Sequence, residues 1–146
     1  MNKKQFPIIL LSLFFSCACY VSGQNWQQTW TGAVKTAQQD HKKILLNFSG
    51  SDWCIPCIRM HKEIFDSQDF VKYSNDSLVL YNADFPRAKK SQPTKEIVAQ
   101  NNKLADTYDS EGSFPLTLLL DSEGHVLKTW KGFFTEGVDK FIAELH

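Results

Sequence analysis

The sequence Trp53-Cys54-Ile55-Pro56-Cys57 (WCIPC) decides how the middle of this chain folds. It follows the apolar run Ile44–Phe48, which has the length of a buried strand, and it begins near the start of residues 54–66, whose apolar positions have helical spacing. At a helix N-terminus, free N–H groups and the positive end of the dipole stabilise a thiolate on the first cysteine. The second cysteine follows one helical turn later, where its sulfur can resolve a mixed disulfide. We therefore predict a redox-active pair, with Cys54 as nucleophile and Cys57 as resolving thiol.

The same spacing also occurs in structural disulfides and in half of a zinc site. Zinc normally takes four ligands from cysteine and histidine side chains. The chain has no second Cys-x-x-Cys motif, and its histidines are scattered along the sequence (His41, His61, His125 and His146). We therefore expect no metal ion and no other cofactor. A purely structural Cys54–Cys57 disulfide stays open as an alternative.

Outward from the WCIPC segment, the expected helices and strands alternate. Apolar spacing predicts helices over residues 25–40, 54–66 and 93–108, with Pro93 in a first turn and Gly112 just past the end. Thr135 is expected to cap a final helix with apolar residues at i, i+3, i+4 and i+7. Apolar runs predict strands at 44–48, 78–81, 116–120 and 125–130, the last two forming an antiparallel hairpin through the turn residues 121–124. This order predicts one α/β domain, a central mixed sheet of about four strands with helices on both faces.

Composition limits the size and the partners of the protein. The chain has 146 residues, which suits one domain better than two. Lys plus Arg and Asp plus Glu each number 16, so the formal net charge is zero. Nucleic-acid binding normally requires a clustered basic face, and we therefore expect no nucleic-acid partner.

The N-terminus has the pattern of an export signal. Lys3 and Lys4 precede a mostly apolar run, residues 6–15, which is shorter than the roughly 20 residues of a membrane-spanning helix. Val21-Ser22-Gly23 then offers the small residues that a signal peptidase recognises. We therefore expect residues 1–23 to be a signal peptide.

Export places the remaining domain, residues 24–146, in a compartment where disulfide chemistry is permitted; in a bacterium, this is the periplasm or cell envelope. The alternative is a lipid anchor on Cys17 or Cys19, although the residues before them match a lipoprotein signal only loosely.

Three features of the chain resemble the thioredoxin family. The first is the WCIPC segment after the strand at residues 44–48. The second is Phe114-Pro115-Leu116-Thr117, which resembles the cis-proline loop that faces the Cys-x-x-Cys motif in this family. The third is Gly132, which matches the glycine at the end of the family's last strand. They occur in the family's order over residues 25–146, and they imply a thioredoxin fold and a thiol–disulfide oxidoreductase.

The resemblance assigns catalysis to Cys54 and Cys57. It further implies an apolar platform on which the substrate backbone lies, made of Trp53, Pro56, Phe114 and Pro115. The implied partners are proteins that contain disulfides and a redox partner that the sequence does not identify.

Pro56 also bears on the direction of the reaction. Proline adds neither charge nor an N–H beside the thiolate, which favours a reductant over a strong oxidant. No residues are left for a dimerisation domain, so we expect a monomer that reduces protein disulfides. The alternatives are a disulfide oxidase or isomerase, and a non-catalytic binding module with the same fold.

The chain departs from the family pattern in one place. Thioredoxin has a buried aspartate on the strand that enters the active site, and this aspartate accepts the proton of the second cysteine. Asn47 takes that place here and cannot accept a proton, and the connection through residues 49–52 is about one residue longer. Asp52 or a water molecule is left as the candidate acceptor.

Other conspicuous side chains have simpler explanations than binding. We expect a surface position for His61 and a turn, not a calcium loop, at residues 121–124. The aromatic residues outside the motif are expected in the core (Trp26, Trp30, Phe133, Phe134 and Phe141). The basic cluster is expected to be a solvated face (Arg87, Lys89 and Lys90).

Overall fold

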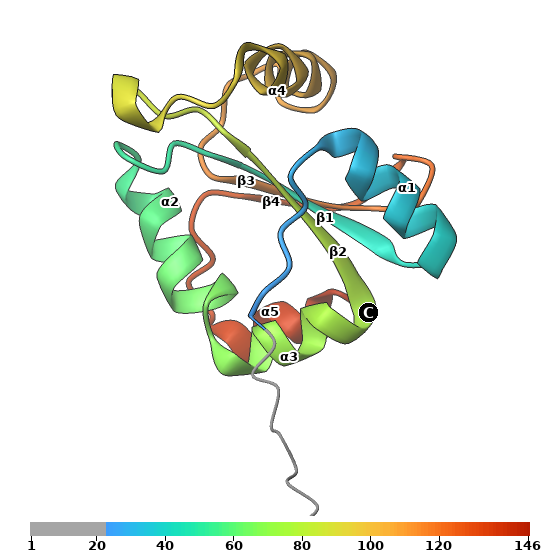
Figure 1. Ribbon diagram of the computed structural model, residues 1–146. Helices are drawn as coiled ribbons and strands as arrows, with labels where there is room; N and C mark the ends of the chain where they lie inside the picture. Colours follow the sequence, from blue (N-terminus) through green and yellow to red (C-terminus); the bar gives the residue numbers. More distant parts are fainter. Residues whose placement is uncertain (1–22) are drawn as a thin grey trace, which may run out of the picture.

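The four predicted apolar runs form one sheet in the computed structural model, which describes residues 23–146. The strands are β1 (Lys43–Ser49), β2 (Leu78–Asp84), β3 (Leu116–Leu120) and β4 (Val126–Lys131). Their order across the sheet is β2-β1-β3-β4 (Figure 1). β2 pairs with β1 in parallel, whereas β3 is antiparallel to both β1 and β4. The predicted hairpin between the last two strands is therefore confirmed.

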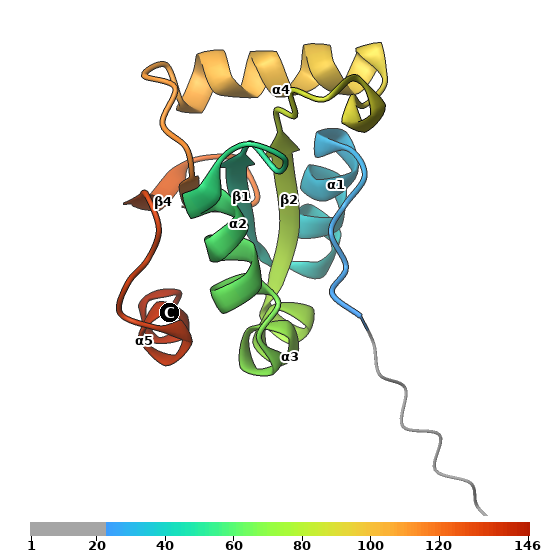
Figure 2. The same ribbon diagram turned by 90° about the vertical axis from the view of Figure 1, so that its left-hand side faces the viewer.

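Helices cover both faces of this sheet (Figures 1 and 2). α1 (Trp30–Asp40) and α4 (Lys95–Tyr108) pack on one face, where Ile44 and Leu46 of β1 point. The other face, where Leu45 points, carries the remaining helices: α2 (Ile55–Met60), η1 (His61–Phe65), α3 (Gln68–Ser77) and α5 (Val138–Glu144). Because both faces are covered, β1 and β3 are buried almost throughout, and their residues are mainly apolar instead of alternating.

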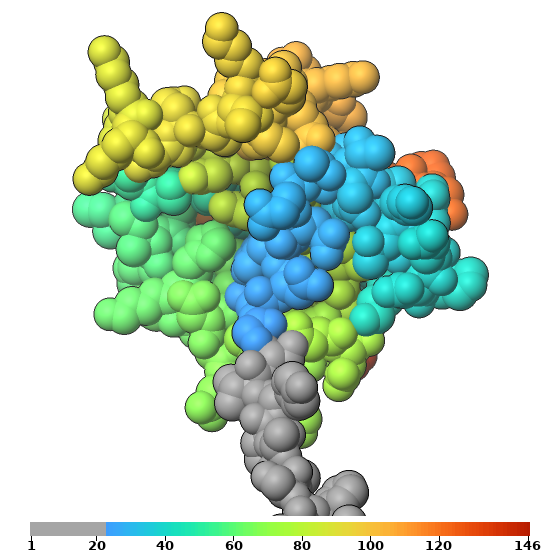
Figure 3. All heavy atoms as spheres, in the orientation of Figure 1, coloured from blue at the N-terminus to red at the C-terminus, as the bar shows by residue number. Residues whose placement is uncertain are grey.

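The first helix is shorter than the predicted one. α1 begins at Trp30, where the Thr29 side chain caps it by accepting a hydrogen bond from the Gly32 N–H. The residues before it are extended: Trp26 forms a β-bridge with Leu80 at the free edge of β2, and the adjacent Gln27 N–H donates to the Leu80 carbonyl. Figure 3 shows this N-terminal stretch lying across the surface beside α1. The prediction of helix from residue 25 was wrong, because pairing to β2 satisfies this backbone better.

The predicted helix over residues 54–66 is two pieces, and α3 was not predicted at all. After α2, the hydrogen-bond pattern widens to the π-helical turn η1. Ser67 then accepts a hydrogen bond from the Phe70 N–H and starts α3, which buries Phe70 and Ser74. Its other residues are mostly polar, so the sequence carried too few apolar positions to reveal the helix.

Two predicted boundary residues, Pro93 and Thr135, were also wrong. α4 begins at Lys95 behind the Thr94 cap, which leaves Pro93 outside the helix. The predicted end of α4 at Tyr108 is confirmed, and Gly112 lies in the turn past it, where its positive φ of 67° suits glycine. α5 follows Gly137, and Thr135 does not cap it.

Between residues 23 and 146, none of the helices has both the length and the apolar character needed to cross a bilayer. The predicted signal peptide and the candidate lipid sites Cys17 and Cys19 lie in residues 1–22, outside the described part, apart from Gly23 at the predicted cleavage site.

Candidate active site

The two cysteines of the WCIPC segment form a disulfide at the start of α2, with their Cα atoms 5.2 Å apart. Cys54 is the N-cap residue, and its sulfur accepts a hydrogen bond from the backbone N–H of Cys57 (3.3 Å). Cys54 is 5% exposed, whereas Cys57 is fully buried. Of the two, Cys54 is therefore the one that a substrate can approach.

The loop from β1 to α2 holds Trp53 directly against Gly50. The N–H groups of Trp53 and Cys54 both donate to the Gly50 carbonyl (3.2 and 2.9 Å). A Cβ atom at position 50 would lie 2.3 Å from Trp53 Cε2, much closer than unbonded carbon atoms approach. The indole therefore packs here only because residue 50 has no side chain.

Three further contacts hold the Trp53 indole. Its Nε1–H donates to the Phe85 carbonyl (2.8 Å), and its ring meets the Phe114 ring edge-on (5.5 Å between centroids). The Arg87 guanidinium lies 3.8 Å from the indole centroid, in a cation–π contact. Phe85 and Phe114 also touch each other (5.6 Å). The segment after β2, residues 85–87, thus packs against Trp53 and forms one wall of the site, called the wall below.

Asp84, at the end of β2, binds the first residues of the loop that leads from β1 to α2, residues 50–54 (the active-site loop). Its carboxylate accepts hydrogen bonds from the Ser49 hydroxyl, from the N–H and hydroxyl of Ser51, and from the Phe85 N–H. These four donors engage both oxygens and fix the loop between β1 and Trp53.

Asp52 connects the same loop to the wall. Its carboxylate accepts hydrogen bonds from the backbone N–H groups of Arg87 (2.9 Å) and Ala88 (2.7 Å). These hydrogen bonds hold the pKa of Asp52 below its ordinary value, with a smaller contribution from the Arg87 charge. Asp52 is exposed and engaged on the wall side, so this geometry does not favour it as the acceptor for the buried Cys57.

A layer of polar side chains lies between the sheet and α2. Asn47 is fully buried, donates to Asn82 Oδ1 (2.8 Å) and accepts from the Thr117 hydroxyl (3.0 Å). Its Nδ2 also lies 3.5 Å from Nε2 of His61. His61 is half-buried and packs against Trp26, so the prediction of a surface histidine was wrong.

Comparisons with known proteins agree with this geometry. A family model described as "Thioredoxin-like domain" matches residues 30–145. The chain belongs to the thioredoxin-like family. It is 36% identical to a disulfide bond reductase, DsbH, of Chlamydia pneumoniae, over 85% of this chain and 80% of that protein.

Solved structures support the same family assignment. A structure titled DsbH oxidoreductase is 31% identical, with a TM-score of 0.76 over 85% of this chain and 83% of the other. A Thermus thermophilus thioredoxin, 15% identical, shares the fold with a TM-score of 0.63, covering 85% of each chain. The predicted fold and the predicted class of enzyme, a thiol–disulfide oxidoreductase, are confirmed.

The structure brings the predicted platform residues to one edge of the sheet. Leu116 pairs with Phe48, so the loop before β3 and the active-site loop leave the sheet side by side. In the former loop, the Phe114–Pro115 peptide bond is cis, as the family resemblance implied, and Pro115 is buried. Pro56 is exposed in the first turn of α2. The binding role of these residues stays a prediction.

Sequence reasoning missed the wall of the site. Phe85 lies directly after β2. Arg87 is exposed, as expected, but its guanidinium also stacks on the Trp53 indole, which was not predicted. No local pattern connects these residues with Trp53, more than 30 positions earlier. Lys89 and Lys90 are exposed, as expected. The aromatic core prediction holds fully for Phe141, which is buried, whereas the other four aromatic residues are partly buried against the core.

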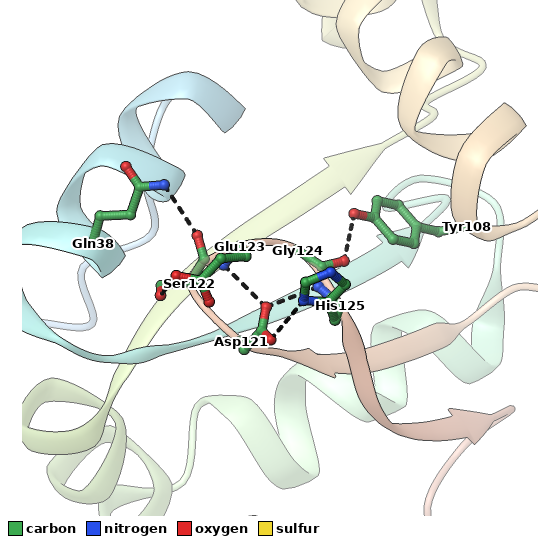
Figure 4. Close-up of polar contacts among 7 residues, drawn as sticks. All are labelled: Gln38, Tyr108, Asp121, Ser122, Glu123, Gly124 and His125. Atoms are coloured by element: carbon green, nitrogen blue, oxygen red, sulfur yellow. Dashed lines mark hydrogen bonds and ion pairs between the residues drawn. The ribbon is translucent and has the colours of Figure 1, made fainter.

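A second cluster of candidate ligands lies on the β3–β4 turn (Figure 4). Asp121, Glu123 and His125 place their ligand atoms within 4.8 Å of one another. Asp121 accepts hydrogen bonds from the N–H groups of Glu123 and His125 and pairs with His125 Nδ1 (2.9 Å). The carboxylate thus closes the turn itself, in agreement with the predicted hairpin turn.

Proposed function

We propose that the protein reduces disulfide bonds of exported proteins through the Cys54–Cys57 pair. The observation that carries this proposal is the position of Cys54 as N-cap of α2, with the Cys57 N–H directed at its sulfur. A thiolate at this place is stabilised by such N–H groups and by the helix dipole, which makes it nucleophilic near neutral pH. The relationship to a disulfide bond reductase supports the reducing direction.

The reaction moves two electrons from the cysteine pair to the substrate. The Cys54 thiolate attacks one sulfur of the substrate disulfide, whose S–S bond breaks, and the other sulfur leaves as a thiolate that takes a proton from water. Cys57 then loses its proton and attacks the Cys54 sulfur. The Cys54–Cys57 disulfide forms, and the second substrate sulfur leaves in the same way. A redox partner must return two electrons to the pair.

The surface around Cys54 suits an extended protein segment. Ile55 and Ile58 are unusually exposed for their size, at 71% and 45%, and they flank the disulfide on α2. With the exposed Pro56 and the partly exposed Trp53 and Phe114, they offer apolar surface on which a substrate backbone can lie. Exposed apolar areas of this kind are typical of interaction sites.

Reduction of insulin by dithiothreitol tests this function. The wild type should accelerate the reaction, and Cys54→Ser should abolish the acceleration. Cys57→Ser should accumulate a mixed disulfide between Cys54 and insulin, visible on a non-reducing gel. Equal rates for all three proteins and for dithiothreitol alone would show that the pair is not catalytic.

The reduction potential separates the reductant from its alternatives. We expect a value near that of thioredoxin, about −270 mV, whereas a strong oxidant has about −120 mV. A structural disulfide in a binding module would resist glutathione buffers, with a potential below about −300 mV. Equilibration with glutathione of defined ratios, followed by alkylation and mass spectrometry, measures which of these holds.

We further propose that the domain is exported as a monomer, with residues 1–23 removed as a signal peptide. The apolar run and the small residues before Gln24 support cleavage there. Cell fractionation and mass spectrometry of the purified protein test this. An N-terminus at Gln24 supports a free periplasmic protein, whereas a lipid on Cys17 or Cys19 supports anchoring in the envelope. Analytical ultracentrifugation measures the oligomeric state.

A further inference from the structure

His61 is a titratable side chain close in sequence to the cysteine pair, and the reaction described above gives it no task. It lies one helical turn after Cys57, and its backbone N–H donates to the Cys57 carbonyl. Residues four positions apart lie on the same face of a helix, so the side chains of Cys57 and His61 leave the same side of it. Rings of Trp26 (5.4 Å) and Phe65 (5.1 Å between centroids) pack against the imidazole.

The surroundings of His61 keep its imidazole neutral. Its pKa lies below the ordinary value because burial disfavours the charged form. The carboxylates of Asp66 and Asp84 and a hydrogen bond with Asn82 oppose this effect but do not reverse it. A neutral imidazole has one nitrogen that can accept a proton.

The second step of the proposed reaction needs such a group. Cys57 is fully buried, so its thiol cannot deliver its proton directly to bulk water. Of the other polar groups nearby, Asn47 does not ionise, and both oxygens of Asp84 are engaged by four donors. Asp52 is tied to Arg87 and Ala88 on the outside of the loop.

We propose that His61 accepts the thiol proton of Cys57 when the mixed disulfide is resolved, an inference that rests on the proposed function. The S–H proton moves to an imidazole nitrogen of His61, and the resulting Cys57 thiolate attacks the Cys54 sulfur. The bond between Cys54 and the substrate breaks, and the substrate sulfur leaves with the electron pair. The imidazolium then returns its proton to water or to the departing thiolate.

The buried amide beside His61 suits this exchange. A side-chain amide that rotates by 180° exchanges its oxygen and its NH₂ group. Asn47 can therefore donate to the neutral imidazole of His61 or accept from the protonated one. Its other partners allow the same turn, because the Thr117 hydroxyl and the Asn82 amide can each donate or accept. A carboxylate at position 47 would instead favour the imidazolium permanently.

Stopped-flow measurement of the two steps tests the proposal. The probe is a fluorescent peptide linked through a disulfide to 5-thio-2-nitrobenzoate. Absorbance of the released 5-thio-2-nitrobenzoate reports the attack of Cys54. Fluorescence anisotropy of the peptide reports its later release from Cys54 by Cys57. The test variant is His61→Gln, which retains hydrogen bonding but does not titrate. The matched control is His125→Gln, on the exposed β3–β4 turn.

We expect His61→Gln to leave the first step within about twofold and to slow the second at pH 7 by at least about tenfold, toward the 10²–10⁴ range of general acid–base catalysis. The pH profile of the second step should also lose the inflection of the imidazole. His125→Gln should match the wild type. A wild-type second step in His61→Gln, or a slower step with an unchanged pH profile, would overturn the proposal.

An NMR titration of the reduced wild type decides the same point without a variant at position 61 and without turnover. If His61 and the Cys57 thiol exchange a proton, their titrations are coupled, and the His61 ring signals should shift in two steps. Cys57→Ser should show a single step. Identical His61 titrations in both proteins would refute the role of His61, whereas failure of the wild type to cleave the peptide disulfide refutes the proposed function instead.

Discussion

Replacing Gly50 with alanine should displace Trp53 and weaken the domain. The φ angle of Gly50 lies outside the region reserved for glycine, so the backbone itself tolerates alanine. The new Cβ, however, would lie 2.3 to 2.6 Å from three atoms of the indole, Cε2, Nε1 and Cζ2. The ring must therefore shift, and this shift weakens its contacts with Phe85, Phe114 and Arg87.

The magnitude follows from these contacts. A hydrogen bond such as that from Trp53 Nε1–H to the Phe85 carbonyl contributes about 0.5–1.5 kcal/mol net, and an aromatic pair about the same. A cation–π contact at an exposed site adds roughly 0.5–1 kcal/mol. Since the three act on one ring and part of each can re-form, we expect Gly50→Ala to lower the free energy of unfolding by about 2–3 kcal/mol.

A double-mutant cycle measured by urea unfolding, followed by circular dichroism, isolates this effect. Trp53→Ala removes the atoms that the new Cβ would meet, so Gly50→Ala should cost less than about 0.5 kcal/mol in that background. Tryptophan fluorescence of the single variant should report a more solvated indole. An equal cost of Gly50→Ala with and without the indole would refute the reasoning.

Phe141→Ala should lower the free energy of unfolding by about 3–5 kcal/mol, because this buried ring contacts four aromatic neighbours; thermal and urea unfolding measure the loss. Acid should destabilise the oxidised protein through His61. Burial lowers the pKa of His61 in the folded state, so the unfolded state binds more protons, and the free energy of unfolding falls as the pH drops below about 6.5. Urea unfolding of His61→Gln should show a smaller dependence of this free energy on pH. His125 should act in the opposite direction. Asp121 raises the pKa of His125, so the stability that this pair adds is present below about pH 6.5 and is lost as the pH rises through the pKa of the folded state. Urea midpoints of the wild type and His125→Gln, compared between pH 5 and 8, measure this loss. Asn101→Ala should cost about 1–3 kcal/mol in urea unfolding, because it leaves the hydroxyl of the buried Tyr81 without its acceptor and the Asp84 carbonyl without this donor.

Much of the fold could be predicted from local pattern. Strands β1 and β3 each contain a short, mainly apolar run, and such a run between turn residues has few alternatives to a buried strand. The hairpin at residues 121–124 was predictable because Asp121 closes the turn with hydrogen bonds to its own neighbours. Where polar residues dominate, as in α3, the pattern failed. Only Phe70 and Ser74 of this helix are buried, and two buried positions are too few to show helical spacing in the sequence.

The sequence by itself determined the cysteine pair and its place at a helix start, because the Cys-x-x-Cys spacing, the preceding strand and Pro56 act through bonds and hydrogen bonds within one turn. Only the tertiary structure decided what surrounds that pair. Arg87 meets Trp53, and His61 meets Asn47, through contacts between residues 14 to 34 positions apart. Such contacts depend on which strands pair and on how the helices pack against the sheet. The spacing of apolar residues along a chain predicts the type of each element but not which elements meet.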